Sequence, residues 1–243
     1  METKDIKQFY DRSLQKSDNK YEFDRWQKTS QGRASYIATK YALLRYALPL
    51  VKNSDAVLEV GPGPGTWTKF LLEKTDGSAY DVVDISEQML KQAKENIGTD
   101  VRLTFIHSDI LDFVPTKQYD FFFSSRFIEY VPEKDRVIEI ISDSLKPGGL
   151  GYIVTKTPQY NRFFSKKVKS PVHQGQISAN ELSDIFVQKG FSVLAVRNVT
   201  SVFPGMRVGF LDRILTFASR HMPFSLAKTF SESYAIIFRK NDI

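Results

Sequence analysis

The sequence predicts an α/β fold, a doubly wound and mostly parallel sheet with helices on both faces. Apolar runs of strand length alternate along the chain with segments whose apolar residues recur at helical spacing, which is typical of a parallel sheet. No internal repeat, low-complexity tract or linker divides the 243 residues, and this length suits one hydrophobic core. We therefore expect a single domain over residues 1–243.

The expected elements follow one another in a regular order. The first is a helix over residues 34–50, which Pro49 and Asn53-Ser54 are expected to close. Its apolar residues at helical spacing are Ile37, Tyr41, Leu44 and Leu48. Seven strands are expected at 56–60, 79–84, 102–107, 119–125, 150–155, 191–199 and 233–239. Further helices are expected at 66–75, from Ser86 onward, at 133–145 and at 179–189.

Local signals mark several of these boundaries. Ser86 is a natural helix N-cap, because its hydroxyl can accept a hydrogen bond from the first turn. The run from Lys146 to Gly149, Lys-Pro-Gly-Gly, is a strong stop signal after a helix. Gly190 is a natural C-cap.

Two segments fall outside the alternation. Residues 1–33 are polar with scattered aromatic residues and are expected to form short helices or an ordered arm that caps the domain. Residues 204–231, between the last two strands, are expected to form an amphipathic helical insert. The insert would either pack on the edge of the sheet or cover an apolar substrate. Its cationic residues, which could also contact an anionic membrane, are Arg207, Arg213, Arg220 and Lys228.

The composition excludes some kinds of chemistry and leaves others open. The chain has no cysteine, which excludes disulfides, cysteine metal sites and cysteine nucleophiles. A formal net charge of +6 permits an anionic partner without requiring one. The N-terminus is charged, and no apolar run is long enough to span a bilayer, so we expect a cytoplasmic protein.

A glycine-rich loop follows the first expected strand and opens onto a helix. Its sequence from Glu59 to Thr66 is Glu-Val-Gly-Pro-Gly-Pro-Gly-Thr. Glycines let a backbone approach a ligand closely, and a helix N-terminus favours negative charge. A dinucleotide fingerprint has the spacing G-x-G-x-x-G, and Thr66 stands where its third glycine would be. The loop alone is equally consistent with a tight turn that binds nothing.

Two acidic residues end the second and third expected strands. Asp84 follows the loop by about 20 residues, a position from which a carboxylate can bind ribose hydroxyls. Asp109 follows the next strand and could accept a hydrogen bond from an adenine amine. Either residue could instead make local contacts, Asp84 with a helix N-terminus and Asp109 in a turn.

Taken together in this order, the motifs resemble those of the class I, Rossmann-like S-adenosylmethionine-dependent methyltransferases. The motifs that carry the resemblance are the glycine loop, Val83-Asp84-Ile85-Ser86, His107-Ser108-Asp109-Ile110, the strand at 119–125 and Leu145–Leu150. The resemblance covers about residues 33–200 and resumes at the last strand. It implies a sheet whose last strand is antiparallel, S-adenosylmethionine as cofactor, and methyl transfer as the activity.

The resemblance also implies a set of cofactor-binding residues. These are Glu59, which would order the loop, and Gly61, Pro62, Gly63, Gly65, Asp84, Ile85, Met89, Asp109, Ile110, Ser124 and Ser125. A general base is needed only if the methyl acceptor carries a proton. His173 is a candidate base or substrate contact, whereas His107 is expected to pack and no role is assigned to His221. Arg126 could bind a carboxylate or phosphate, or pair locally with Glu129.

Four functions remain open on this basis. The first is methyl transfer to a small molecule such as a lipid, quinone or secondary metabolite. The second is methylation of RNA, against which stands Ser124-Ser125-Arg126-Phe127 in place of an Asn/Asp-Pro-Pro-aromatic motif, so we expect no nucleic-acid partner. The third is NAD-dependent oxidoreduction, which the missing third glycine disfavours. The fourth is cofactor binding without catalysis. No metal site and no oligomeric state are predicted.

Overall fold

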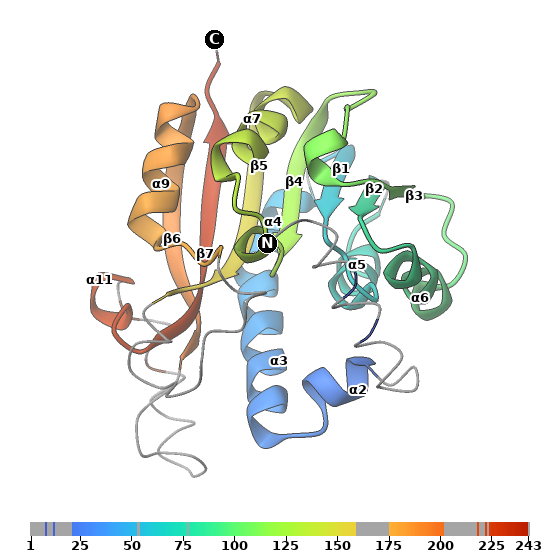
Figure 1. Cartoon of the computed structure of the whole chain (residues 1–243), viewed down its shortest axis with the longest axis horizontal. Helices are drawn as coiled ribbons and strands as arrows, with labels where there is room; N and C mark the ends of the chain where they lie inside the picture. Colours follow the sequence, from blue (N-terminus) through green and yellow to red (C-terminus); the bar gives the residue numbers. More distant parts are fainter. Residues whose placement is uncertain are drawn as a thin grey trace.

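The computed structural model describes residues 8, 12, 21–52, 54–76, 78–158, 175–201, 218, 222 and 224–242. Its centre is a seven-stranded sheet in the order β3-β2-β1-β4-β5-β7-β6 (Figure 1). The strands are β1 (Ala56–Val60), β2 (Ala79–Asp84), β3 (Leu103–His107), β4 (Tyr119–Ser125), β5 (Leu145–Lys156), β6 (Phe191–Ser201) and β7 (Ser231–Lys240). Strands β1 to β5 pair in parallel, and β7 pairs antiparallel with both β5 and β6. The expected mostly parallel sheet with an antiparallel last strand is confirmed.

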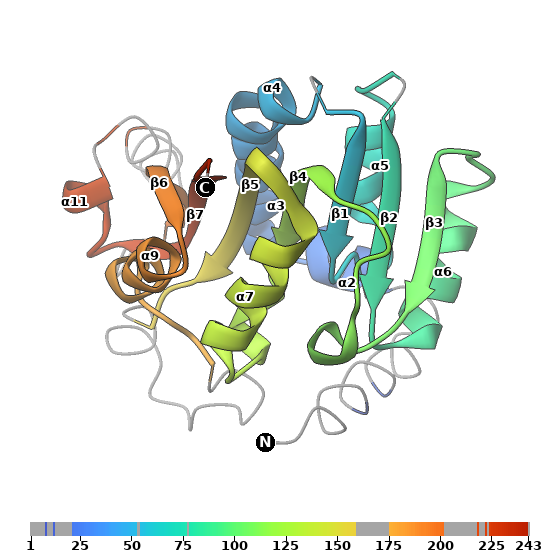
Figure 2. The same ribbon diagram turned by 90° about the horizontal axis from the view of Figure 1, so that it is seen from above.

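Helices cover both faces of this sheet (Figure 2). The α-helices are α2 (Tyr21–Trp26), α3 (Ser30–Ala42), α4 (Leu48–Val51), α5 (Thr66–Leu72), α6 (Glu87–Ile97), α7 (Lys134–Ser144), α9 (Ala179–Gln188) and α11 (Phe224–Ala227). A π-helical turn, η1 (Leu43–Ala47), joins α3 to α4, and two 3-10 turns are η2 (Ile110–Asp112) and η3 (Ile128–Tyr130).

The pleat of the strands divides the core into two layers. Val57, Phe121 and Phe123 pack with α3, α4 and α5 on one face. Leu58 and Phe122 point the other way and pack with α7 and α9. Side chains that alternate between faces, and are apolar on both, are characteristic of a sheet buried on both sides. This double burial holds the carboxyl ends of β1, β2 and β4 at one rigid edge.

Local signals place two of the helices as expected. The Ser86 hydroxyl accepts a hydrogen bond from Met89 N, 3.2 Å away, so α6 begins at Glu87. Ser178 and Glu181 form a capping box at the start of α9, in which each side chain accepts from the other's backbone N–H. Both caps fix helices that follow directly from turns at the edge of the sheet.

Two expectations about the elements were wrong. Pro49 does not itself close the first helix, which continues through η1 into α4, because proline is tolerated in the first turn of an α-helical segment. The helix nevertheless ends where expected, since α4 stops at Val51, before Asn53-Ser54. The buried face of α3 and η1 is formed by Ala38, Ala42 and Leu43, whereas Ile37 and Leu44 are exposed. The stop signal at 146–149 does end α7, but these residues belong to β5, which begins at Leu145.

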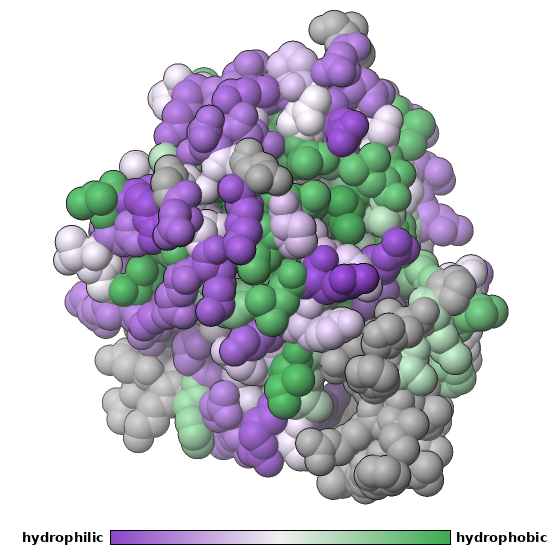
Figure 3. Space-filling model, turned by 180° about the vertical axis from the view of Figure 1, so that it is seen from behind, coloured by the Kyte–Doolittle hydropathy of each residue, from purple (hydrophilic) through white to green (hydrophobic). Residues whose placement is uncertain are grey.

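Hydrophilic side chains cover much of the face in Figure 3, with apolar patches between them. Among the described helices, none is long and apolar enough to cross a membrane. The insert at 204–231 lies mostly outside the described residues, which here include only 218, 222 and the stretch from α11 to the start of β7.

Candidate active site

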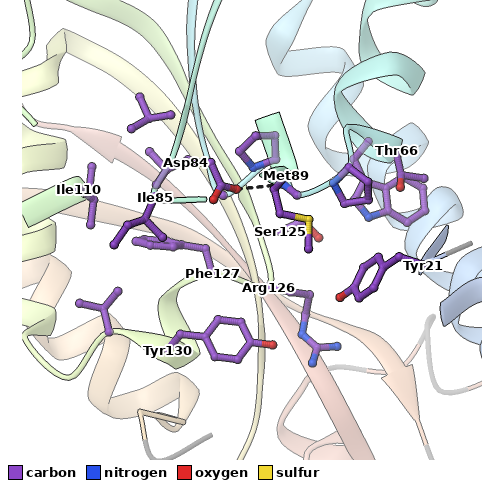
Figure 4. Close-up of a pocket in the computed structure, with 18 of the residues that line it drawn as sticks. Tyr21, Thr66, Asp84, Ile85, Met89, Ile110, Ser125, Arg126, Phe127 and Tyr130 are labelled. Atoms are coloured by element: carbon purple, nitrogen blue, oxygen red, sulfur yellow. Dashed lines mark hydrogen bonds between the residues drawn. The ribbon is translucent and has the colours of Figure 1, made fainter. Parts of the chain in front are cut away.

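A pocket opens at the carboxyl ends of β1, β2 and β4. In an open parallel sheet this edge is where ligands bind, because the strand order reverses there. The part of the pocket formed by the strand ends and their loops is lined by Val60, Gly61, Pro62, Gly63, Val83, Asp84, Ile85, Met89, Ser108, Asp109 and Ile110. The remaining part is lined mainly by α2, α5 and the residues from Ser125 to Val131. Figure 4 shows Ile85 and Ile110 at one end and Tyr21 and Arg126 towards the other.

The glycine loop contains two glycines with contrasting surroundings. Gly63 and Gly65 both have positive φ, 56° and 80°, which L side chains rarely adopt. A Cβ on Gly63 would meet nothing within 4 Å, because this residue faces the pocket. A Cβ on Gly65 would lie 2.9 Å from Ile97 Cδ1 and 3.1 Å from Ala93 Cβ. Gly63 therefore permits a ligand to approach, whereas Gly65, which does not line the pocket, permits α5 to pack against α6.

Asp84 connects the second strand to the glycine loop. Its Oδ2 accepts a hydrogen bond from Gly63 N at 3.3 Å, drawn dashed in Figure 4, and its Oδ1 accepts one from Ser86 N at 2.9 Å. Both contacts use backbone donors, so the carboxylate is fixed in direction by the loop and the start of α6.

A flat apolar slot lies next to Asp84. Ile85, Met89 and Ile110 line it together with Phe127. Asp109 stands at its edge, where its Oδ1 accepts from Leu111 N at 3.0 Å. The expected turn role of Asp109 is thus observed, and it is compatible with a second role toward a ligand.

Glu59 lies behind the loop rather than in the pocket. It is 2% exposed, does not line the pocket, and its Oε2 has no hydrogen-bond partner among the described residues. Burial raises the pKa of Glu59 to about 8; the neighbouring Thr68 hydroxyl opposes this rise and Asp84 adds to it. The geometry fits the expected ordering role better than direct contact with a ligand.

Of the two serines at the end of β4, one lines the pocket and the other does not. Ser124 is fully buried, and its Oγ donates to Val60 O at 2.9 Å, so it joins β4 to β1 and does not line the pocket. Ser125 lines the pocket, and its buried Oγ has no partner in the described part of the chain. Only Ser125 can offer its hydroxyl to a ligand.

Arg126 lies in the wall of the pocket and is held by a buried carboxylate. Its Nε donates to Glu129 Oε1 at 2.6 Å, and the Glu129 side chain is 0% exposed. Burial disfavours the guanidinium charge, but Glu129 more than offsets this, so the pKa of Arg126 lies above its ordinary value. Burial likewise disfavours the Glu129 charge, and Arg126 nevertheless keeps the pKa of that carboxyl below 4.5. The local ion pair predicted from the sequence is present, and it leaves Arg126 in the pocket.

The sequence did not single out the residues that α2 and α5 bring to the pocket. Tyr21, Arg25 and Trp26 line it from α2, and Trp67 lines it from α5. The two tryptophans meet edge to face, with ring centroids 5.5 Å apart. Within residues 1–33, which were expected to cap the domain, helix α2 therefore lies at the pocket. Aromatic residues in the arm were the only signal for it.

The histidines do not supply a base in the described part of the pocket. His173 and His221 lie outside the described residues. His107 was expected to pack in the core but is exposed, because β3 is the edge strand of the sheet. Its Nε2 lies 3.0 Å from Ile85 O, so it supports the backbone of the apolar slot from outside.

Comparison with known proteins identifies the central part of the chain. Residues 57–149 match a family model described as a methyltransferase domain. This stretch contains the glycine loop, Asp84, Asp109 and Arg126, and therefore most of the pocket.

Two relatives and one solved structure extend this comparison. The chain is 33% identical over 129 residues to malonyl-[acyl-carrier protein] O-methyltransferase 2 of Ilyobacter polytropus, and this match covers 50% of this chain and 49% of that protein. Trans-aconitate 2-methyltransferase of Rhizobium rhizogenes is 26% identical over 97 residues, 40% of this chain and 36% of that protein. The chain thus spans about half or less of the length of these curated relatives.

The crystal structure of N-methyltransferase NodS from Bradyrhizobium japonicum with S-adenosyl-l-homocysteine has a TM-score of 0.64 to this chain. The sequences are 14% identical, and the match covers 97% of this chain and 98% of NodS. This likeness shows that the chain shares the Rossmann-like fold of NodS.

Proposed function

We propose that this protein binds S-adenosylmethionine in the pocket and transfers its methyl group to a carboxylate oxygen of a small acceptor. The observation that carries the proposal is the guanidinium of Arg126, fixed in the pocket wall at the end of β4. Next to it in the chain is Ser125, whose hydroxyl has no hydrogen-bond partner among the described residues. A guanidinium offers paired N–H donors that match the two oxygens of a carboxylate.

The adenosine half of S-adenosylmethionine fits the strand-end part of the pocket. Asp84 would accept hydrogen bonds from the ribose hydroxyls, and the slot between Ile85 and Ile110 would hold the adenine ring. Asp109 would accept from the adenine amine. The open space at Gly63 would admit the part of the cofactor that crosses the loop. The described donors and acceptors therefore suit this cofactor.

Charge favours an anionic acceptor at the other end. The charged residues that line the described pocket are Arg25, Arg126, Asp84 and Asp109. Both carboxylates are used at the adenosine end, which leaves two guanidinium groups. The cofactor carries one carboxylate, on its methionine part, and Arg25 of α2, which lines the pocket, would bind it. Arg126 would then remain for a carboxylate of the acceptor.

Methyl transfer to a carboxylate requires little from the protein beyond the correct positions of the acceptor and the cofactor. The cofactor supplies a methyl group bound to a cationic sulfur, which is displaced in line by the acceptor oxygen, so that a C–O bond forms as the C–S bond breaks. A carboxylate is ionised at neutral pH, with an ordinary pKa near 4, and needs no general base. This agrees with the described lining, which holds no histidine or lysine. Arg126 would orient the acceptor, and Trp26 and Trp67 would exclude water.

The relatives support the same acceptor chemistry. One is named for O-methylation of a malonyl group and the other for methylation of trans-aconitate, and both acceptors are carboxylic acids. The earlier expectation of an apolar acceptor rested on the insert at 204–231, which is mostly outside the described residues, and it stays a prediction. An acceptor with an anionic head and an apolar tail would satisfy both arguments.

A labelled-methyl assay tests the proposal. The full chain is incubated with methyl-labelled S-adenosylmethionine and either malonate, trans-aconitate or the amine sarcosine. We expect label in a product of malonate or trans-aconitate that mild alkali releases as methanol, since methyl esters hydrolyse and N-methyl groups do not. Sarcosine carries both an amine and a carboxylate, so alkali decides which of the two is methylated. Label that resists alkali, in any of the three products, would overturn the assignment to a carboxylate oxygen.

A further inference from the structure

Arg126, whose guanidinium lies in the wall of the pocket, has an unusual backbone conformation. Its φ is +66°, and it is the one non-glycine residue with positive φ in the described part of the chain. Its backbone N–H donates to Val154 O at 2.8 Å, which ties this conformation to β5. A strained residue persists only where its surroundings determine it, and such residues are frequent at functional sites.

The Glu129 carboxylate is itself fixed on three sides. Its Oε1 accepts from Arg126 Nε, whereas its Oε2 accepts from Thr155 Oγ1 at 2.8 Å and from Lys156 N at 3.1 Å. The latter two donors lie at the end of β5. Glu129 thus connects the rigid sheet to the Arg126 guanidinium, with no solvent between them to weaken the contact.

The way in which Glu129 engages Arg126 leaves its terminal nitrogens available. Only Nε is used, and neither Nη atom has a hydrogen-bond partner among the described residues. Arginine loses about 2 kcal/mol of rotamer freedom when it is fully ordered. A guanidinium already held at Nε incurs less of that loss when it binds a ligand through its Nη groups.

We propose that Glu129 is a positioning residue, which holds Arg126 so that its two Nη groups face the acceptor. This rests on the proposed function, because the acceptor is taken to be a carboxylate. Glu129 would not touch the acceptor, and its effect on turnover would pass entirely through Arg126. A merely structural ion pair would instead stabilise the fold and leave acceptor binding unchanged once the protein is folded.

Nuclear magnetic resonance tests whether Glu129 clamps the Arg126 side chain at Nε, and it does so without any turnover. We call this contact the clamp. The ¹H–¹⁵N signal of Arg126 Nε, assigned by its absence from Arg126→Lys, should exchange slowly with water in the wild type. In Glu129→Gln it should exchange at least tenfold faster. A slow Arg126 signal that Glu129→Gln leaves unchanged would overturn the clamp, whatever the protein methylates.

A double-mutant cycle tests whether the clamp acts on the acceptor. Malonate is the probe, with kcat/KM for methyl transfer and Kd from titration as readouts, and with S-adenosylhomocysteine binding as the check that each variant is folded. Glu129→Gln should lower kcat/KM at least tenfold in the wild type and less than twofold in the Arg126→Lys background. Equal losses in both backgrounds, or a wild-type loss under twofold, would contradict a positioning role.

Glu129→Asp keeps the test decisive if Glu129→Gln does not fold. This variant retains the charge but shortens the side chain, so it should fold and recover part of the malonate affinity while the Nε exchange stays intermediate. Full malonate affinity with a fast-exchanging Nε would overturn the proposal. If malonate fails to bind while the wild-type Nε signal is slow and depends on Glu129, then the carboxylate acceptor is wrong and the clamp stands.

Discussion

The two ends of the pocket are constructed differently. The adenosine end is formed by the loops after β1, β2 and β3, so its residues lie at strand ends that the sheet brings together. The acceptor end combines α2, α5 and the residues after β4, which are far apart in sequence. The first end is therefore a property of the fold, whereas the second depends on individual side chains. Cofactor binding and acceptor choice should accordingly respond to different substitutions.

Gly63→Val is expected to have the largest effect on the adenosine end. The new side chain would enter open space in the pocket, so S-adenosylmethionine binding should fall by more than 100-fold, while the strained φ should cost about 1–2 kcal/mol of folding stability. Gly65→Ala is the matched control. It should lose about 1–3 kcal/mol of stability by crowding Ile97 and Ala93, yet keep cofactor affinity when folded. Calorimetry and thermal unfolding separate these effects; if both variants lost affinity equally, the contrast between the glycines would be wrong.

Arg126→Lys tests the acceptor end. Lysine keeps the charge but loses both the planar fork and the Nε contact, so kcat/KM for a carboxylate acceptor should fall about 100-fold, equivalent to about 2.7 kcal/mol. The Kd of S-adenosylhomocysteine should change less than threefold, since Asp84 and the apolar slot are untouched. A large change in that Kd with unaltered turnover would reverse our assignment of the two ends.

Asp84→Ala should weaken S-adenosylmethionine binding by about 1–3 kcal/mol, because ribose hydroxyls would be left without an acceptor in a buried site. The loop would also lose the contact from Gly63 N. Asp84→Asn serves as the control, since its amide oxygen can still accept from the backbone. Affinity that is unchanged in both variants would remove Asp84 from the cofactor site.

Glu59 lies outside the pocket, so its expected effect is on the pH dependence of stability and not on ligand binding. Because burial raises its pKa to about 8, the folded protein retains a proton that the unfolded chain releases above pH 4.5. Stability should therefore fall as pH rises between about 4.5 and 8, by at most about 1.4 kcal/mol per pH unit from this group. Urea unfolding at pH 5 and pH 8 should show that Glu59→Gln removes part of this decline. If the free energy of unfolding of Glu59→Gln changed with pH as steeply as that of the wild type, the raised pKa of Glu59 would be ruled out.

The difference between the two ends also explains what could be read from the sequence. The motifs around Gly63, Asp84 and Asp109 predicted the adenosine end because turns and strand-end acids are local features. The same reasoning assigned Gly65 and Ser124 to the pocket, although one packs between helices and the other joins two strands. Spacing shows that a residue is near an edge, but not which way its side chain faces.

The acceptor end was less predictable for a physical reason. Tyr21, Arg25 and Trp26 reach the pocket only because α2 folds back onto α3 and α5, and no local pattern encodes that contact. Arg126 and Glu129 were recognised as a pair from their spacing. Sequence spacing did not predict the left-handed backbone at Arg126, a conformation that favours glycine.

Binding of malonate to the protein saturated with S-adenosylhomocysteine tests the central claim most directly, namely that one pocket holds a cofactor end and a carboxylate end anchored by Arg126. Calorimetry should show a single saturable malonate site in the wild type. The site should be lost in Arg126→Lys, and the uncharged dimethyl malonate should give no heat. The account is contradicted if malonate binds wild type and Arg126→Lys equally well, or if it fails to bind a wild-type protein that is loaded with S-adenosylhomocysteine.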